Sequence, residues 1–598
     1  MKCNFNITCN NQRLQKHLLS TIFFICFFNT SAQYYIRGEV KDEKNQTLQN
    51  VKIYLHSSHL LFYSGTTGGF GIPTSYLYDS LTFNADGYEP KSVRVKSDVY
   101  QEISLKMSFV KVNLQKQKLA SLTEDLNKNT DNGLFGNESY SSLIENDFIK
   151  AYKYPATAFS LRVDKASYSN IRRFINQKTT VPPDAVRIEE MLNYFNFNYK
   201  EPEKNDVFKI ESQLTSCPWN AEHELLFINV NAKKLNIDTI PASNFVFLID
   251  VSGSMDLPNR LPLLKASFQL LVKNLRDKDT ISIVTYGGTV GVWLQPTSGA
   301  EKQKIIKAIE ELTAFGDTPG EAGIRAAYRL AKSSFIKGGN NRIILATDGD
   351  FNVGQSTEKE LEELILKERQ SGIYLTCLGV GMGNYKDSKI ETLAKKGNGN
   401  FAYLDDIKEG EKVLVKELTQ TLYTVANDVF LNVQFNADMV NEYRLIGYDN
   451  KKNLLSDSAN TLEGGEIGSG NGITAIFEII PTEEGLYGDV FKDDIATIKL
   501  NYRLPDERIA KSDEYVCINN YKEFEEINND LKFASSIAMF GLVLHSSKYA
   551  SHISWNEIAR IAVASKNPDD YLQNEFIGLI DKAKKIYSKK KKKNKNEK

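Results

Sequence analysis

One carboxylate and two hydroxyl side chains occur at alternating positions where an apolar, strand-like stretch ends. Asp250 is the last residue of the run NFVFLID, and Ser252 and Ser254 follow it. A loop with this spacing can turn the three side chains inward as hard oxygen ligands of low total charge, which suit Mg²⁺, or Mn²⁺ or Ca²⁺, better than Zn²⁺. Taken alone, the pattern is more typical of a turn that caps a helix.

Two later loops carry matching groups. Thr318 lies in FGDTPG, before the amphipathic segment GIRAAYRLA, and Asp348 lies in LATDGD, after the apolar run RIIL. Each has an ordinary explanation alone, because Thr caps helices and Asp-Gly forms turns. Asp350 is a nearby acid that the arrangement does not require. Together and in this order, the loops predict a divalent-metal site formed by Asp250, Ser252, Ser254, Thr318 and Asp348.

The elements around these loops follow a regular alternation. From residue 242 to 425, apolar runs such as FVFLIDV and RIILAT alternate with amphipathic helical segments. This pattern predicts an α/β doubly wound parallel sheet whose strands are covered on both faces. Ligands bind such sheets at the carboxyl ends of the strands, where the predicted metal site lies.

The order Asp-x-Ser-x-Ser, then Thr, then Asp, resembles the metal-ion-dependent adhesion site of the von Willebrand factor A domain, a Rossmann-like fold. The resemblance implies that Ser252, Ser254 and Thr318 contact the ion through their hydroxyls. It implies that Asp250 and Asp348 act mainly through water or hydrogen bonds. It also implies an open coordination position, which an Asp or Glu carboxylate of a protein partner fills.

The flanking sequences extend the resemblance to a family of bacterial von Willebrand factor A proteins. The segments TAFSLRVDKASYSNIRRFINQ, VPPDAVRIEEMLNYFNFNY and CPWN resemble its N-terminal domain, expected here over 145–241. The segments NEYRLIGYDN, GGEIGSG and FGLVLHSSKY resemble its C-terminal domain of unknown function, expected as an α+β domain over 426–588. Arg162 stands where the family pattern has an acid, so we expect Asp164 to pair with Arg172 or Arg173 rather than hold a ligand.

The N-terminal segment predicts export, and the following segments predict a β-domain and a linker. An apolar run over 18–28 with basic flanks predicts a signal peptide over 1–32, cut near Ala32. Residues 33–107 alternate in short strands and resemble the carboxypeptidase regulatory-like domain, a β-sandwich without catalytic residues. A polar linker over 108–144 follows, and a Lys-rich tail over 589–598 is expected to be a solvated, disordered end.

Composition and motifs narrow the function classes. In 598 residues, Lys and Arg number 74 against 75 Asp and Glu, which gives no electrostatic footprint for nucleic acid. The motifs HExxH, GxSxG and GxxxxGK[ST] do not occur, so the sequence predicts no catalytic residue and no organic cofactor.

The mature chain contains three isolated cysteines, Cys217, Cys377 and Cys517. Their spacing predicts buried free thiols, and the alternative is one long-range disulfide between two of them.

These observations predict a non-enzymatic, divalent-metal-dependent protein-binding module of adhesion type. We expect it in the periplasm or cell envelope, or at the cell surface. Membrane association stays open, without a spanning segment once the signal peptide is removed. One alternative is an envelope scaffold in which the ion only stabilises the fold; a less favoured one is a metal-assisted hydrolase.

Overall fold

The computed structural model places two compact units, 1–108 and 109–598. It describes residues 34–43, 45–85, 88–107, 138–236, 238–316, 320–349, 358–383, 385–448, 464–483, 485, 494–505, 507 and 509–596. The predicted signal peptide and most of the predicted linker therefore lie outside the described residues. None of the described helices is long and apolar enough to cross a membrane.

The first unit consists of two antiparallel or mixed sheets. One contains β4 (Gly69–Thr74), β1 (Tyr34–Asp42) and β7 (Gln101–Leu105), and the other contains β3 (Leu60–Tyr63), β2 (Lys52–Leu55), β5 (Tyr78–Asn84) and β6 (Lys91–Lys96). Side chains alternate between buried and exposed along β1 and β5, with Ile36, Val40 and Phe83 fully buried. The predicted all-β character of this region agrees with these strands.

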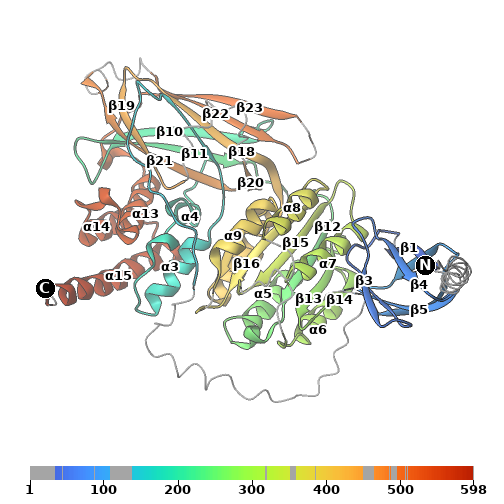
Figure 1. Cartoon of the computed structure of the whole chain (residues 1–598). Helices are drawn as coiled ribbons and strands as arrows, with labels where there is room; N and C mark the ends of the chain where they lie inside the picture. The colour runs from blue at the N-terminus through green and yellow to red at the C-terminus, as the bar shows by residue number, and fades with distance from the viewer. Residues whose placement is uncertain are drawn as a thin grey trace, which may run out of the picture. The chain divides into compact units, whose positions relative to one another are not determined.

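A six-stranded sheet forms an α/β domain within the second unit, which we call the central α/β domain from its place in the sequence (Figure 1). Its order is β14 (Thr289–Ser298), β13 (Thr280–Gly287), β12 (Ser243–Asp250), β15 (Asn340–Thr347), β16 (Ile373–Val380) and β17 (Phe401–Leu404). Adjacent strands are parallel except for β14, which forms an antiparallel hairpin with β13. The predicted doubly wound sheet is therefore present with one antiparallel edge.

Helices cover both faces of this sheet. Phe247 of β12 stacks on Phe268 of α5 (Leu261–Lys273), with ring centroids 4.3 Å apart, and α6 (Lys302–Glu310) packs beside α5. Three other helices contact the sheet: α7 (Gly320–Ser333), α8 (Glu358–Arg369) and α9 (Asp387–Lys396). The short elements α10 (Ile407–Glu411), η3 (Lys412–Lys416) and α11 (Leu418–Leu422) lead out of the domain. Every residue of β12 is buried, as its apolar sequence predicts.

The segments before and after this domain share two sheets. One sheet has the order β10 (Phe208–Ser216), β11 (Glu224–Ala232), β21 (Gly472–Pro481), β19 (Val440–Ile446) and β8 (Ile149–Lys150). The other has β20 (Gly465–Gly468), β18 (Thr424–Phe435), β22 (Asp494–Arg503) and β23 (Ala510–Ile518), and β9 (Ala156–Ser160) also pairs with β18. We call this shared structure the composite domain. The N-terminal flank, 145–241, and the C-terminal flank, 426–588, both contribute strands to it.

The helices of the composite domain also come from both flanks. They are α3 (Ala166–Asn176), η1 (Pro183–Ala185), α4 (Ile188–Asn193), η4 (Phe524–Glu526), α13 (Asn529–His545), η5 (Lys548–Ala550), α14 (Trp555–Ser565) and α15 (Tyr571–Asn596). Phe195, which follows α4, packs on Phe533 of α13 and Phe576 of α15. The backbone of α15 continues through the Lys-rich segment to Asn596, whereas a disordered end was expected there. Lys is a good helix former, which lets a packed helix extend into this segment.

Buried ion pairs connect the composite domain to the central α/β domain. Arg172 of α3 binds Asp405 at 2.5 Å and Glu409 at 2.7 Å, both in the segment that follows β17. The neighbouring Arg173 binds Glu138, which precedes the composite domain in the sequence, at 2.8 Å. Asp164 instead lies 3.8 Å from Arg162 and accepts a hydrogen bond from the backbone N–H of Phe401. The prediction that Asp164 pairs with Arg172 or Arg173 is therefore wrong, because both arginines have other carboxylates within reach.

Glu224, at the start of β11, makes the stability of the composite domain depend on pH. Burial, and secondarily the charge of Glu523, raises its pKa from 4.5 to about 7 in the folded protein. Stability is therefore lost as the pH rises from about 4.5 to 7, because the folded state holds the proton more tightly than the unfolded state. We expect Glu224→Gln to raise the free energy of unfolding by about 1–2 kcal/mol at pH 8 and to leave it unchanged at pH 4. Urea denaturation at pH 4 and pH 8 measures this change in the free energy of unfolding. An equal change at both pH values would contradict the role of Glu224.

Candidate metal centre

Asp250 is the last residue of the central strand β12 and is fully buried. Its Oδ1 accepts the backbone N–H of Ser252 at 2.9 Å, and its Oδ2 accepts the hydroxyl of Thr347 at 2.9 Å. Thr347 ends the neighbouring strand β15, which runs parallel to β12. The sheet thus fixes both oxygens of Asp250 at its carboxyl edge.

Ser252 and Ser254 project from the loop that follows β12. Their Oγ atoms lie 3.1 Å apart, with Ser252 buried and Ser254 exposed. The loop continues as the single turn η2 (Gly253–Asp256), so the two hydroxyls converge at one point of the sheet edge. The alternating spacing of the sequence therefore produces the predicted convergence of these oxygens.

The loop that carries Thr318 is held against the Ser252–Ser254 loop. The N–H of Gly253 donates to the carbonyl of Gly316 at 2.9 Å, and the N–H of Phe315 donates to the carbonyl of Val251 at 2.6 Å. Gly316 has φ +79°, and a Cβ there would lie 2.5 Å from the Cα of Gly288, so a side chain is excluded twice over. Thr318 itself, like Asp350, lies outside the described residues.

Asp348 follows β15 and is buried beside Arg260, a residue that does not belong to the Asp-x-Ser-x-Ser motif. Arg260 Nη1 donates to Asp348 Oδ2 at 2.6 Å and to the carbonyl of Ser254 at 2.7 Å. Its Nη2 donates to the carbonyl of Met382 at 3.0 Å, and its side chain packs against Gly381. Sequence reasoning missed Arg260 and Thr347, since neither belongs to the Asp-x-Ser-x-Ser pattern and no spacing rule connects them to it.

The electrostatics of these groups favour a cation. Burial, together with the charge of nearby Asp348, raises the pKa of Asp250 to about 7. The described ranges contain no group of three or more His, Cys, Asp or Glu side chains placed to hold a metal. The oxygens described at this edge belong to two Asp carboxylates and two Ser hydroxyls. Two acids beside converging hydroxyls suit a hard divalent cation, which takes oxygen ligands. The residues present therefore fit such an ion, with Arg260 as the fixed counter-charge of Asp348.

Arg260 balances Asp348 when no divalent ion is bound. We expect Arg260→Gln to lower the free energy of unfolding in EDTA by about 2–3 kcal/mol, because a buried carboxylate loses its charged partner. Saturating Mg²⁺ is expected to recover part of this loss, because ion binding to the folded state adds stability. Urea denaturation of both proteins in EDTA and in Mg²⁺ tests this. An identical loss under the two conditions would show that Arg260 has no coupling to the ion.

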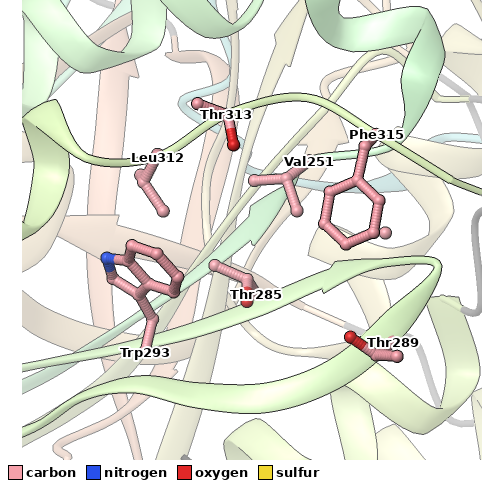
Figure 2. Close-up of a pocket in the computed structure, with 8 residues that line it drawn as sticks. Val251, Thr285, Thr289, Trp293, Leu312, Thr313 and Phe315 are labelled. Carbon is pink, nitrogen blue, oxygen red and sulfur yellow. The ribbon is translucent and has the colours of Figure 1, made fainter. Parts of the chain in front are cut away.

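The surface beside these residues is shallow. Val251, Thr285, Trp293, Leu312 and Phe315 surround a hollow between the β13–β14 hairpin and the segment that precedes Thr318 (Figure 2). Its volume is about 10 Å³, enough for no more than one water molecule. Close to Ser254, Leu257 is 49% exposed. This hollow is therefore too small to enclose an organic molecule.

The three cysteines of the described chain lie away from the residues described at this site. Cys217, Cys377 and Cys517 are free and buried, as the sequence predicts, and burial raises the pKa of the Cys517 thiol to about 12. The glycines of Gly379–Gly383 form the exit from β16, where Gly381 and Gly383 have φ of +84° and +88°. They shape the turn after β16, where the Arg260 side chain packs against Gly381.

Comparison with known proteins gives three family matches. The von Willebrand factor type A domain matches residues 244–421, and the C-terminal domain of the uncharacterized protein YfbK matches residues 420–586. A family described as von Willebrand factor matches residues 134–227. The matches together cover the central α/β domain and both flanks that build the composite domain.

Individual relatives differ in how much of the chain they share. Uncharacterized protein YfbK of Escherichia coli is 40% identical over 478 residues, which is 75% of this chain and 81% of that protein. Inter-alpha-trypsin inhibitor heavy chain H2 of Mesocricetus auratus is 29% identical over 34% of this chain and 21% of its own length. The magnesium-chelatase 67 kDa subunit of Chlorobaculum parvum is 24% identical over 35% of this chain and 38% of its own length. The chain belongs to the family of YfbK, in which a von Willebrand factor A domain is combined with a YfbK-type C-terminal domain.

Proposed function

We propose that this protein is a non-enzymatic, divalent-metal-dependent protein-binding module. Ser252, Ser254 and Thr318 would hold the ion through their hydroxyls, and Asp250 and Asp348 would hold it through water or hydrogen bonds. The ion, Mg²⁺ or else Mn²⁺ or Ca²⁺, would supply an open position for an Asp or Glu carboxylate of the partner. The observation that carries the proposal is the convergence of Ser252 and Ser254 above buried Asp250 at the carboxyl edge of β12.

The surface around the site supports a protein partner. Ser254 and Leu257 are exposed on one loop, so a partner that reaches the ion would also contact an apolar side chain. The neighbouring hollow is too small to enclose a substrate. The relationship to an inhibitor heavy chain agrees with a binding role, and the relationship to a chelatase subunit keeps the enzymatic alternative open to test.

The location of the protein is part of the proposal. The apolar run over 18–28 supports a signal peptide over 1–32 and therefore export to the periplasm or cell envelope. The β-strands of residues 34–107 support a carboxypeptidase regulatory-like β-sandwich that spaces the binding module from its surroundings. The boundaries 145–241, 242–425 and 426–588 serve as the working division of the rest, with the outer two joined in the composite domain.

A pull-down from an envelope extract tests the proposal. The bait is the exported chain in Mg²⁺ or in EDTA, with Asp348→Asn as the site variant and Asp256→Asn as the control, because Asp256 is an exposed acid in the same loop. We expect a partner to be retained by the wild-type and control proteins in Mg²⁺ alone. A partner retained equally in EDTA would move the binding surface away from the ion and favour the scaffold alternative. Mg²⁺-dependent substrate turnover lost in Asp250→Ala would favour a hydrolase.

A further inference from the structure

The turn that follows β16 contacts both the proposed metal centre and the composite domain. It contains Gly381, Met382 and Gly383, and we call it the 381–383 turn. On one side, the carbonyl of Met382 accepts a hydrogen bond from Arg260 Nη2 at 3.0 Å. The turn therefore contacts the residue that binds Asp348.

Arg260 neutralises the charge of Asp348. Its Nη1 donates to Asp348 Oδ2 at 2.6 Å and to the carbonyl of Ser254 at 2.7 Å. The Arg260 side chain is 7% exposed and that of Asp348 is 2% exposed, so salt and water screen this pair only weakly. The negative charge that would draw a divalent ion toward Asp348 is therefore already balanced by a cation of the chain.

On its other side, the 381–383 turn is bound by residues from outside the central α/β domain. The N–H of Gly383 donates to Glu138 Oε1 at 2.8 Å. The side-chain amide of Gln177, at the end of α3, donates to the sulfur of Met382 at 2.9 Å. Glu138 is itself fixed by Arg173 of α3, which donates to both of its carboxylate oxygens at 2.8 Å. The position of the turn thus depends on α3 of the composite domain.

Tyr403 of β17 fixes the first residue of the turn. Its hydroxyl donates to the carbonyl of Gly381 at 2.5 Å, and its ring centroid lies 5.2 Å from the guanidinium carbon of Arg173. A Cβ at Gly381 would lie 2.6 Å from Arg260 Nε, so the backbone of the turn lies directly against the Arg260 side chain. Hydrogen bonds therefore fix all three residues of the turn, and the turn in its place fixes Arg260.

A divalent ion and the Arg260 guanidinium carry charges of the same sign and use the same carboxylate. The affinity of an oxygen site for such an ion depends on the charge that its ligands supply. Repulsion between the ion and a nearby guanidinium opposes binding further. Arg260 therefore lowers the affinity for the ion as long as the 381–383 turn keeps it against Asp348.

We propose that Arg260 is a built-in competitor of the divalent ion, and that the composite domain sets the ion affinity through the 381–383 turn. This inference rests on the proposed metal-dependent function. While the turn is bound to Glu138, Gln177 and Tyr403, Arg260 stays on Asp348 and the ion binds weakly. A shift of α3 against the central α/β domain would release Arg260 and raise the affinity. Because coupling between two sites is reciprocal, a bound ion favours the released turn to the same extent.

Titration of the full exported chain with Mn²⁺, followed by electron paramagnetic resonance, tests the competition. We expect Arg260→Gln to bind Mn²⁺ about tenfold more tightly than the wild-type protein, because the competing charge is removed. The control is Arg276→Gln, which removes the same charge from an ion pair with Asp279 that precedes β13. It is expected to bind within about twofold of the wild-type protein. A merely structural role of Arg260 would not produce a gain in affinity, and equal or weaker binding by Arg260→Gln would overturn the proposal.

The variant Tyr403→Phe tests the coupling through the turn without changing any charge. It removes only the hydroxyl that binds the carbonyl of Gly381, and we expect the Mn²⁺ affinity to rise about threefold, as the loss of part of one hydrogen bond allows. In the Arg260→Gln background the same change is expected to have no effect, because the turn acts through Arg260.

The matched control is Tyr194→Phe. It removes a buried hydroxyl that donates to Glu409 at 2.5 Å, at another contact between the composite domain and the segment after β17. We expect this variant to leave the Mn²⁺ affinity unchanged. Unchanged affinity in Tyr403→Phe, an equal gain in Tyr194→Phe, or a gain that persists in the Arg260→Gln background would overturn the coupling.

The outcomes separate this inference from the proposed function. Equal Mn²⁺ affinity in the wild-type protein and Arg260→Gln would overturn the inference and leave the metal-dependent function standing. Absence of Mn²⁺ binding in both proteins would overturn the two together. Binding by Arg260→Gln alone would support both, because it would show that the wild-type site is blocked by its own arginine.

Discussion

Replacing Asp348 with Asn is expected to lower the Mg²⁺ affinity of this protein on the order of 100-fold without unfolding it. The charge of Asp348 acts on Asp250, whose pKa it helps to raise, so the two acids form one electrostatic site. Asn keeps the shape of the side chain and an oxygen that can accept from Arg260, whereas Ala would leave that buried guanidinium unpaired. Isothermal titration with Mg²⁺ measures the affinity, and circular dichroism checks the fold.

The matched control is Asp256→Asn, the same substitution at an exposed acid of η2 that makes no contact with Asp250 among those the structure gives. It is expected to bind Mg²⁺ within about twofold of the wild-type protein, because an exposed charge is screened by solvent. Equal Mg²⁺ affinity in Asp348→Asn and the wild-type protein would contradict the assignment of Asp348. A loss of equal size in Asp256→Asn would show that general surface charge, rather than this site, attracts the ion.

Replacing Arg342 with Met is expected to cost about 3–5 kcal/mol of folding stability. Arg342 of β15 is fully buried and binds Glu466 of β20 at 2.5 Å and the hydroxyl of Thr376 at 2.7 Å. The pair joins the von Willebrand factor A domain to the composite domain. Removing the cation leaves the Glu466 carboxylate buried without its partner, so the cost exceeds that of losing one hydrogen bond.

Denaturation by urea measures this cost, with two comparisons. The double variant Arg342→Met/Glu466→Leu is expected to recover much of the loss, since an apolar pair carries no unpaired charge. Lys304→Met, which breaks an exposed pair with Glu301, is expected to change stability by less than about 1 kcal/mol. A loss in Arg342→Met as small as that in Lys304→Met would mean that the buried pair does not stabilise the junction.

The central sheet could be predicted from the sequence because its signals are local. The buried strand β12 has no polar residue between Phe245 and Ile249, and the alternation of Asp250, Ser252 and Ser254 begins where that strand ends. The position of the loop at the carboxyl edge then follows from the topology of the fold. The antiparallel direction of β14 was missed, because a hairpin strand and a crossover strand can share the same apolar pattern.

The composite domain could not be predicted because its pairings are remote in sequence. Leu226 of β11 pairs with Phe477 of β21, and Phe159 of β9 pairs with Leu431 of β18, across the whole central domain. Nothing in the composition of either flank shows that it lacks a complete sheet of its own. Arg260 and Thr347 were missed for a similar reason, since their roles arise from neighbours that only the folded chain supplies.

Anomalous diffraction from crystals of this protein grown with excess Mn²⁺ shows whether an ion binds at the carboxyl edge of β12. We predict an anomalous peak at the carboxyl edge of β12, in contact with the hydroxyls of Ser252, Ser254 and Thr318 and beside Asp250 and Asp348. We predict that the peak is absent from crystals of Asp348→Asn grown under the same conditions. An empty site in the wild-type crystals, or a peak bound by other residues, would contradict the account.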